Sequence, residues 1–167
     1  KVMVCHVLRY SPFYLKFKEK IHNGELGEII NIQTIENVSY HHITTSFVRG
    51  KWGNSDRCKT SMLLAKCCHD MDIMMWMMSP VRPVSVSSVG SLGQFKIENA
   101  PENSGTYCLK DCPNVDSCQY SATKPYLDHL GSWDFYVWQE LESVENPTME
   151  QRIELLKKSP YGKCVYK

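Results

Sequence analysis

Residues 61–78, SMLLAKCCHDMDIMMWMM, are the most informative stretch of this chain and decide the fold that we expect. Thr60 and Ser61 supply a helix cap in front of the stretch, and Ser79-Pro80 ends it. We therefore predict one strongly amphipathic helix over these residues. Because most of its side chains are Met, Leu and Trp, we expect the helix to be largely buried.

One face of this predicted helix carries side chains that can exchange protons. Lys66, His69 and Asp70 fall at positions i, i+3 and i+4 and therefore lie close together on the helix. Burial shifts the pKa values of Lys and His toward the range used in proton transfer. The alternative interpretation is an ordinary, partly solvated helix face.

Upstream of this helix, the sequence predicts a strand followed by another helix. Residues 2–8, VMVCHVL, have the apolar pattern of a strand that is buried on both faces of a parallel sheet. Ser11-Pro12 has the residues of a helix start, and Asn23-Gly24 has those of a helix end.

Two further stretches, Glu28–Val38 and Val81–Leu92, alternate apolar and polar residues in the manner of strands with one buried face. The remaining segments are predicted as a loop over residues 39–59, an irregular cysteine-containing segment over 93–132, and short helices over 132–142 and 148–158. The second of these helices has Thr148 as its cap and Gln151 at the capping-box position. The expected fold class is therefore α+β.

Composition narrows the class of protein. The chain has 167 residues, of which 43% are apolar and 22% charged, as in a globular domain. Its net charge of +1 provides no basic surface for nucleic acid, and no apolar run approaches the roughly 20 residues that span a bilayer. We expect a cytoplasmic protein. Because the chain opens at Lys1 in an apolar run, we interpret it as part of a longer protein.

The cysteines form a second candidate site. Without a signal segment, the eight cysteines are expected to be free thiols or metal ligands rather than disulfides. Cys108, Cys112 and Cys118 are separated by three and five residues, and Cys164 follows near the end of the chain. Four thiolates suffice for a structural zinc ion, which we favour slightly, or for an iron–sulfur cluster. Buried thiols without a metal are the alternative.

The long loop contributes two candidate ligands for a small substrate. His42 and Arg49 can reach a hydroxyl or carboxylate group. The sequence contains no nucleophile elbow, zinc-protease helix or phosphate-binding loop, so it lacks the minimal parts of those enzyme classes.

The order of these elements resembles the Gfo/Idh/MocA family of NAD(P)-dependent oxidoreductases over about residues 1–95. The stretches that carry the resemblance are RYSP at 9–12, GELGEI at 24–29, ENV at 36–38, SFVRG at 46–50 and LAKCCHD at 64–70. We expect an uncharacterised subgroup of the family with an insert that contains cysteines.

The resemblance implies two domains. Residues 1–24 would contribute the last strand and helix of a dinucleotide-binding Rossmann domain. Residues 25–167 would form a partial catalytic domain, built on a predominantly antiparallel open sheet with helices on one face and the cysteine-rich insert at about 93–132. In this family the open face of the sheet packs on another subunit, so the resemblance implies a homo-oligomer.

The resemblance also implies an activity, namely hydride transfer between NAD or NADP and a secondary alcohol or ketone of a sugar or cyclitol. Arg9 and Tyr10 would lie near the cofactor. His69 matches the family's catalytic histidine, although Ala65 stands where the family carries an aspartate. We expect His69 to be the acid/base and Lys66 to orient the substrate oxygen or to lower the pKa of His69. The opposite assignment of the two roles is the alternative.

The substrate-binding residues expected from the sequence are His42, Arg49 and Asp70. Two other functions stay open at this point. The loss of the aspartate at Ala65 favours a non-enzymatic sensor or assembly protein of the same fold. The four cysteines favour a structural metal-binding domain.

Overall fold

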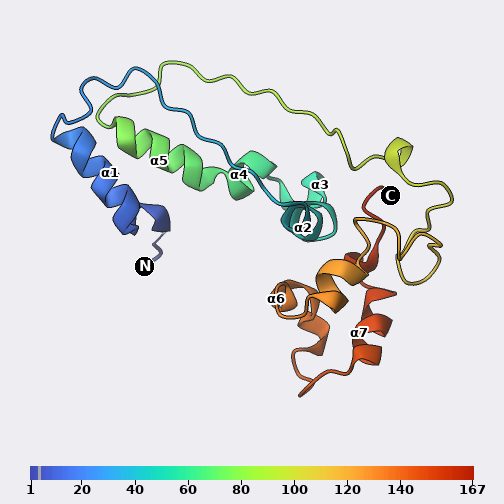
Figure 1. The fold of residues 1–167 in the computed structure, drawn as a ribbon. Helices are drawn as coiled ribbons and strands as arrows, with labels where there is room; N and C mark the ends of the chain where they lie inside the picture. The colour runs from blue at the N-terminus through green and yellow to red at the C-terminus, as the bar shows by residue number, and fades with distance from the viewer. Residues whose placement is uncertain (4) are drawn as a thin grey trace. The chain divides into compact units, whose positions relative to one another are not determined.

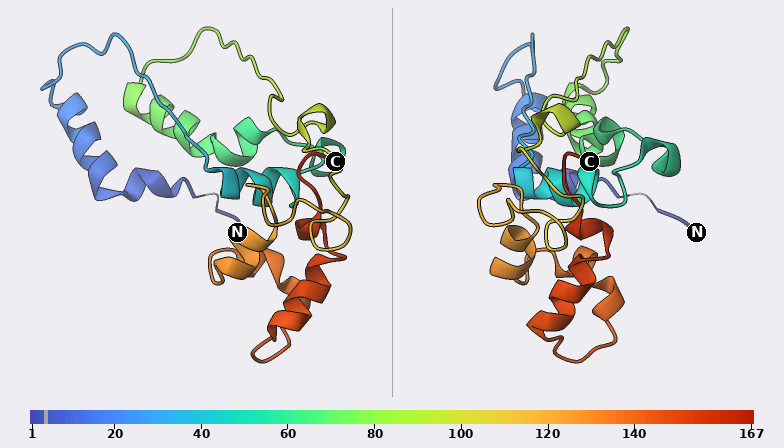
Figure 2. Two further views of the ribbon diagram at one scale, coloured as in Figure 1. Left: turned by 45° about the vertical axis from the view of Figure 1, so that its right-hand side comes forward. Right: turned by 90° about the vertical axis from the view of Figure 1, so that its right-hand side faces the viewer.

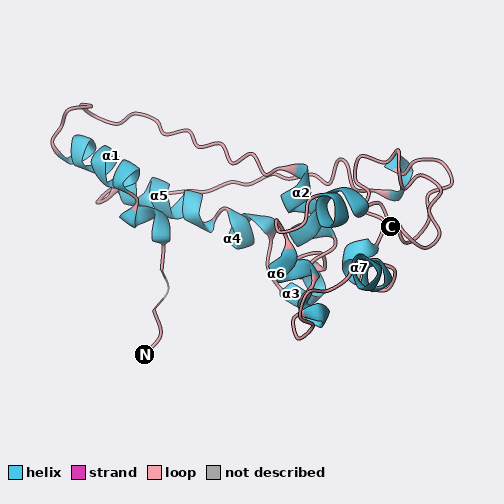
Figure 3. Ribbon diagram, turned by 60° about the horizontal axis from the view of Figure 1, so that its bottom comes forward, coloured by secondary structure: helices cyan, strands magenta, loops and turns pink. Residues whose placement is uncertain are grey.

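The computed structural model describes residues 1–3 and 5–167 and consists of helices and loops (Figure 1; Figure 3). Within these residues β-structure is limited to one isolated antiparallel bridge, between Tyr107 and Lys163. The chain divides into two compact units, residues 1–37 with 60–89 and residues 38–59 with 90–167. The domain boundary expected at residue 24 stays a prediction. No helix in the described part is long and apolar enough to cross a membrane.

The first unit contains α1 (Pro12–His22), α4 (Met62–Lys66) and α5 (Cys68–Met78). The predicted limits of α1 are confirmed, because Pro12 is its first residue and Asn23 its C-cap. Gly24 follows with a φ of 74°, a backbone conformation that glycine adopts without a steric penalty. A 3₁₀ turn over Val7–Tyr10 lies where the end of the first strand was predicted, and Val4 lies outside the described residues.

The predicted helix over residues 61–78 begins and ends as expected but is divided in the middle. Ser61 caps its start by accepting a hydrogen bond from the Leu64 amide at 3.3 Å. Cys67 leaves helical geometry, with ψ at 11°, and separates α4 from α5. The expectation of a largely buried helix is wrong, because only Ile73 and Met77 are buried in α5.

Contacts between α1 and α5 hold the first unit together (Figure 1). The Lys18 ammonium donates hydrogen bonds to the main-chain oxygens of Trp76 at 2.8 Å and Met77 at 3.2 Å. These carbonyls belong to the last turn of α5, at the negative end of the helix dipole, and the Trp76 oxygen also accepts a hydrogen bond from the Ser79 amide. Lys18 therefore stabilises the end of α5 electrostatically.

The expected open antiparallel sheet is wrong. Residues 28–38 and 81–92 run without regular structure, and in the described chain their backbones form no strand ladder (Figure 3). Most of their apolar side chains are exposed, with Ile30 at 86% and both Val84 and Val89 at 100%. Alternation selects a face for burial, but a strand forms only when a neighbouring strand pairs with its backbone. The homo-oligomer expected through a sheet face stays a prediction.

The predicted loop over residues 39–59 is also wrong, because much of it is helical. It contains α2 (Tyr40–Ile43), a π-helical turn over Thr44–Val48 and α3 (Ser55–Cys58). Its polar residues cap these turns or bond inside the second unit. Thr45, for example, lies buried with its hydroxyl 2.9 Å from that of Tyr126. The polar composition of residues 39–59 therefore led to the prediction of a loop where the chain forms partly buried helical turns.

Toward its C-terminus the second unit contains α6 (Asp134–Val137), a 3₁₀ turn over Gln139–Leu141, α7 (Met149–Leu156) and a last 3₁₀ turn over Pro160–Gly162 (Figure 2). The capping box predicted at α7 is confirmed: the Gln151 amide donates to the Thr148 hydroxyl at 3.3 Å, and the Thr148 amide donates to the Gln151 side chain at 2.9 Å. The main core of the unit consists of Cys108, Ala122, Tyr126, Val137, Trp138, Leu155 and Leu156. A second buried cluster consists of Cys164, Val165 and Tyr166.

Candidate functional site

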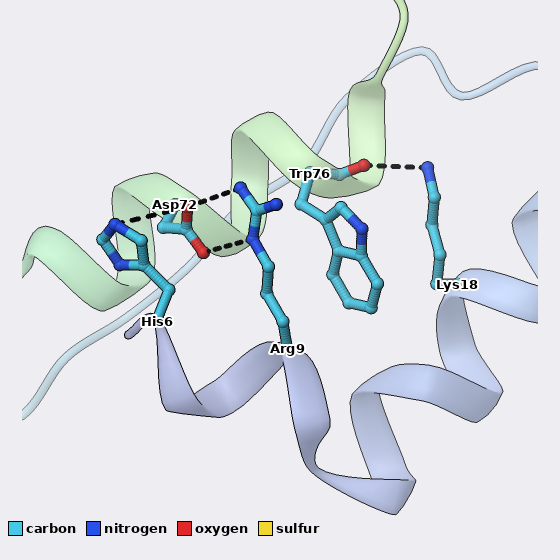
Figure 4. Close-up of polar contacts among 5 residues, drawn as sticks. All are labelled: His6, Arg9, Lys18, Asp72 and Trp76. Atoms are coloured by element: carbon cyan, nitrogen blue, oxygen red, sulfur yellow. Dashed lines mark hydrogen bonds and ion pairs between the residues drawn. The ribbon is translucent and has the colours of Figure 1, made fainter. Parts of the chain in front are cut away.

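A buried carboxylate organises the polar face of the first unit (Figure 4). Arg9 donates from Nη2 to Asp72 Oδ1 at 2.6 Å and from Nε to Asp72 Oδ2 at 2.7 Å. The Asp72 side chain is 10% exposed. The hydrogen bonds from Arg9 hold the pKa of Asp72 below its usual range, although burial acts in the opposite direction. Asp72 is therefore an ionised, fixed negative charge at neutral pH.

Two histidines flank this carboxylate. His6 Nε2 lies 3.8 Å from Asp72 Oδ1, which is ion-pair distance when the imidazole is protonated. The His69 ring meets the His6 ring edge-on, with centroids 6.1 Å apart. The Nδ1 atoms of both histidines are buried without a hydrogen-bond partner in the described structure. An imidazole nitrogen without a partner remains available to accept or donate a proton.

An open pocket of about 430 Å³ adjoins the cluster. His6 and Asp72 are its ionisable lining residues, and its walls are mostly apolar: Leu63, Leu64, Met71 and Met75, with Ser61 and Cys68. Small-molecule sites combine a mostly apolar wall with a few polar groups in this way, at volumes of about 300–1,000 Å³. The arrangement can hold a small molecule beside the His6 imidazole and the Asp72 carboxylate.

Lys66 does not join His69 in an acid/base pair. Its ammonium lies 3.0 Å from Glu36 Oε1, and both side chains are about one-third exposed, at 30% and 35%. Lys66 is the last residue of α4, so the break at Cys67 separates it from the face of α5 that carries His69. Asp70 lies in the first turn of α5, where it and Glu36 add to the effect of burial in raising the pKa of the Cys67 thiol.

His42 and Arg49, two of the expected substrate ligands, belong to the second unit, whereas Asp70 belongs to the first. Arg49 is 5% exposed and donates hydrogen bonds to the main-chain oxygens of Lys163 and Tyr120, each at 2.7 Å. It therefore ties three chain segments together. The half-buried His42 ring packs 5.4 Å from the Trp133 ring, between centroids.

Arg9 and Tyr10, the expected cofactor ligands, do not form a dinucleotide cradle. The Arg9 guanidinium is bound to Asp72, and Tyr10 is 71% exposed. The helix that follows, α1, begins at Ser11-Pro12 rather than at the glycine-rich turn that brings a helix N-terminus against a pyrophosphate. The described residues thus do not fit NAD or NADP by themselves.

The four predicted cysteine ligands all line one small cavity of the second unit. Cys108, Cys112, Cys118 and Cys164 are free thiols around a cavity of about 10 Å³. In the described residues, no three His, Cys, Asp or Glu side chains already stand in metal-binding geometry. Burial raises the pKa of Cys164, and the neighbouring Cys108 and Cys112 raise it further.

Sequence reasoning missed His6, Asp72 as a buried partner, and Glu36. Arg9 and Asp72 are 63 positions apart, and no local pattern connects them. The one available signal was the spacing of three residues between His69 and Asp72, which places both on one face of a helix. The cluster therefore emerges from tertiary contacts.

Comparison with known proteins assigns the chain to a family. Residues 18–115 match the family model of the Gfo/Idh/MocA C-terminal domain, described as "Oxidoreductase family, C-terminal alpha/beta domain". The chain therefore belongs to the Gfo/Idh/MocA oxidoreductase family.

A curated relative is the "Putative oxidoreductase YteT" of Bacillus subtilis (strain 168), which is 27% identical over 124 residues. The alignment covers 72% of this chain and 28% of the relative, so the chain spans little more than a quarter of that protein's length. No solved structure matches the chain.

Proposed function

We propose that this chain supplies the proton-transfer and substrate-binding part of an NAD(P)-dependent dehydrogenase acting on a secondary alcohol of a sugar or cyclitol, or on the matching ketone. The observation that carries the proposal is the match of residues 18–115 to an oxidoreductase domain. The cluster of His6, His69 and Asp72 beside a pocket of about 430 Å³ supports the acid/base chemistry that such a reaction needs.

In this proposal the chain's own residues bind the substrate and move its hydroxyl proton, and a bound dinucleotide would supply the hydride chemistry. His69 is the acid/base, because its Nδ1 is a buried nitrogen without a partner beside the fixed charge of Asp72. Arg9 positions Asp72 by holding both of its oxygens.

Lys66 has the second role in the proposal. Its ion pair with Glu36 fixes the ammonium, which then orients the substrate oxygen as a hydrogen-bond donor. In the opposite assignment, Lys66 moves the proton and His69 orients the oxygen. The pH dependence of turnover by the Lys66→Ala variant distinguishes the two assignments. Asp70, which lies in the same unit as His69, stays in the proposal as a further substrate contact, and the roles expected for His42 and Arg49 stay predictions.

The test measures turnover of a panel of polyols and cyclitols by the full-length protein. The absorbance of the reduced nicotinamide monitors the reaction. We expect His69→Ala to lower kcat by about a hundredfold or more, the usual scale of general acid–base catalysis. Folding, followed by circular dichroism, should survive the change.

The matched control is His22→Ala, which removes an exposed histidine from the last turn of α1. Equal turnover in His69→Ala and the parent protein would show that the α5 histidine is structural. If no polyol is oxidised in the presence of either dinucleotide, the sensor or assembly function replaces the enzyme.

A further inference from the structure

Three thiols of one segment, Cys108, Cys112 and Cys118, and the distant thiol of Cys164 surround one cavity in the second unit. Cys108 and Cys164 are buried, at 7% and 9% exposure, and Cys112 and Cys118 are half-buried. The cavity volume of about 10 Å³ is close to that occupied by one water molecule or one ion. The space therefore suits a single atom rather than a multi-atom cluster.

The backbone holds two of these thiols in register. The Cys108 amide donates to the Gly162 carbonyl, and the Cys164 amide donates to the Thr106 carbonyl, each at 2.8 Å. This reciprocal pair of hydrogen bonds surrounds the bridge between Tyr107 and Lys163. Cys108 and Cys164 are thus brought together across 56 positions of sequence by main-chain hydrogen bonds that do not depend on the thiols themselves.

Turns in the cysteine-rich segment carry the other two thiols to the same cavity. The Asp111 carboxylate accepts hydrogen bonds from the amides of Thr106 at 2.9 Å and Tyr107 at 2.7 Å, which closes the chain between Cys108 and Cys112. The Cys118 amide donates to the Asn114 carbonyl at 2.8 Å. The spacing of three and five residues is therefore compatible with convergence of all three sulfurs.

The Cys108 sulfur receives two N–H donors. The Ala122 amide lies 3.5 Å from it, and Arg49 Nη2 lies 3.7 Å from it. Donors of this kind stabilise a thiolate and recur in the outer shell of metal-bound cysteines. Arg49 also brings a buried positive charge, which offsets part of the excess negative charge that four thiolates leave around a divalent cation.

We propose that Cys108, Cys112, Cys118 and Cys164 bind one zinc ion as a structural site. Zinc favours four thiolates in tetrahedral geometry at about 2.3 Å, and it needs no redox partner. In the described structure no group of three or more His, Cys, Asp or Glu side chains is placed to hold a metal ion, so zinc binding requires the four thiols that line the cavity to move inward. The ion then fixes a segment that has little regular structure of its own.

The first experiment measures metal in protein purified without chelator under reducing conditions. We expect one zinc per chain, and zinc release when a mercurial reagent titrates the thiols. Cys108→Ser and Cys164→Ser should each lose the zinc. The matched control is Cys68→Ser, in α5 of the first unit, which should retain it.

Less than a tenth of an equivalent of zinc overturns the proposal, as does iron in its place or full zinc in the Cys108→Ser and Cys164→Ser variants. None of these results bears on turnover, so the proposed function and the zinc site fail separately.

The second experiment does not depend on the folding of a variant. In the zinc-loaded protein, mass spectrometry follows alkylation of each cysteine before and after a strong chelator is added. We expect the four cavity cysteines to react only after chelation, whereas the exposed Cys5 reacts at once. Equal protection with and without the chelator shows simple burial and contradicts the site. Replacing zinc by cobalt should give thiolate-to-metal charge-transfer absorption, and its absence also contradicts the site.

Discussion

At the scale of single residues, the first unit concentrates its electrostatics on Asp72. Arg9 binds both carboxylate oxygens, His6 stands at ion-pair distance, and the Arg9 side chain is 41% exposed while Asp72 is 10% exposed. A mostly buried carboxylate has already lost most of its hydration. Removing its bidentate partner would therefore leave a charge that neither water nor protein stabilises. The stability of this unit should therefore depend on the ionisation of Asp72.

We expect Asp72→Asn to lower the free energy of unfolding by about 1–3 kcal/mol at pH 7, the usual cost of losing charged hydrogen bonds. The pKa of Asp72 is lowered in the folded protein, so its contribution is present above the unfolded pKa of about 3.9. The contribution is lost as pH falls through the folded pKa. Urea unfolding at several pH values measures the difference between variant and parent.

The difference in the free energy of unfolding between the parent protein and Asp72→Asn should therefore become smaller in acid. Asp116→Asn is the control, because it removes an exposed carboxylate of the second unit. If this difference in the free energy of unfolding stays constant from neutral to acid pH, the destabilisation comes from packing rather than from charge.

At the scale of elements, helices and extended segments differ in what they need to form. The backbone of α7 bonds to itself, and Thr148 and Gln151 cap its start within four residues of sequence. Residues 81–92 have the alternation of a strand, but no strand pairs with their backbone in the described chain. Their valines therefore contribute little burial, whereas Leu156 in α7 is fully buried.

Substitution of these apolar residues should show the contrast. We expect Val84→Ser and Val89→Ser to change the free energy of unfolding by less than about 0.5 kcal/mol, as for other exposed positions. Leu156→Ala, which creates a cavity in the main core, should cost about 2–5 kcal/mol. Chemical denaturation of the 167-residue chain measures all three. A cost above about 1 kcal/mol at Val84 would indicate that residues 81–92 are packed after all.

At the scale of the whole molecule, the chain matches the C-terminal domain of its family, and its described residues form no dinucleotide cradle. Residues 18–115 match the C-terminal domain of the oxidoreductase family, and the alignment covers 28% of the B. subtilis relative. Neither Arg9 nor Tyr10 forms a phosphate site in the described structure. The proposed hydride transfer therefore needs dinucleotide-binding residues other than these.

We expect the 167-residue chain to bind neither NAD nor NADP with micromolar affinity, because no glycine-rich turn leads into a helix N-terminus. Titration calorimetry with each dinucleotide checks this expectation. The outcome that contradicts it is a saturable heat signal at micromolar concentrations that Arg9→Ala abolishes, since Arg9 would then be a cofactor ligand.

The sequence by itself determined the features that depend on neighbouring residues. The limits of α1, the cap at Ser61, the capping box of α7 and the family all follow from local patterns. Each of these helical features rests on interactions within one turn, which a short stretch of chain contains completely.

Only the tertiary structure decided which distant residues meet. It paired Arg9 with Asp72 and Lys66 with Glu36, and it brought four cysteines to one cavity. It also left the alternating segments without strand partners. Such contacts require the closure of long loops and depend on everything packed between the two ends. The pattern of one segment therefore indicates which of its residues can be buried or can bind, and the rest of the fold determines which residues they contact.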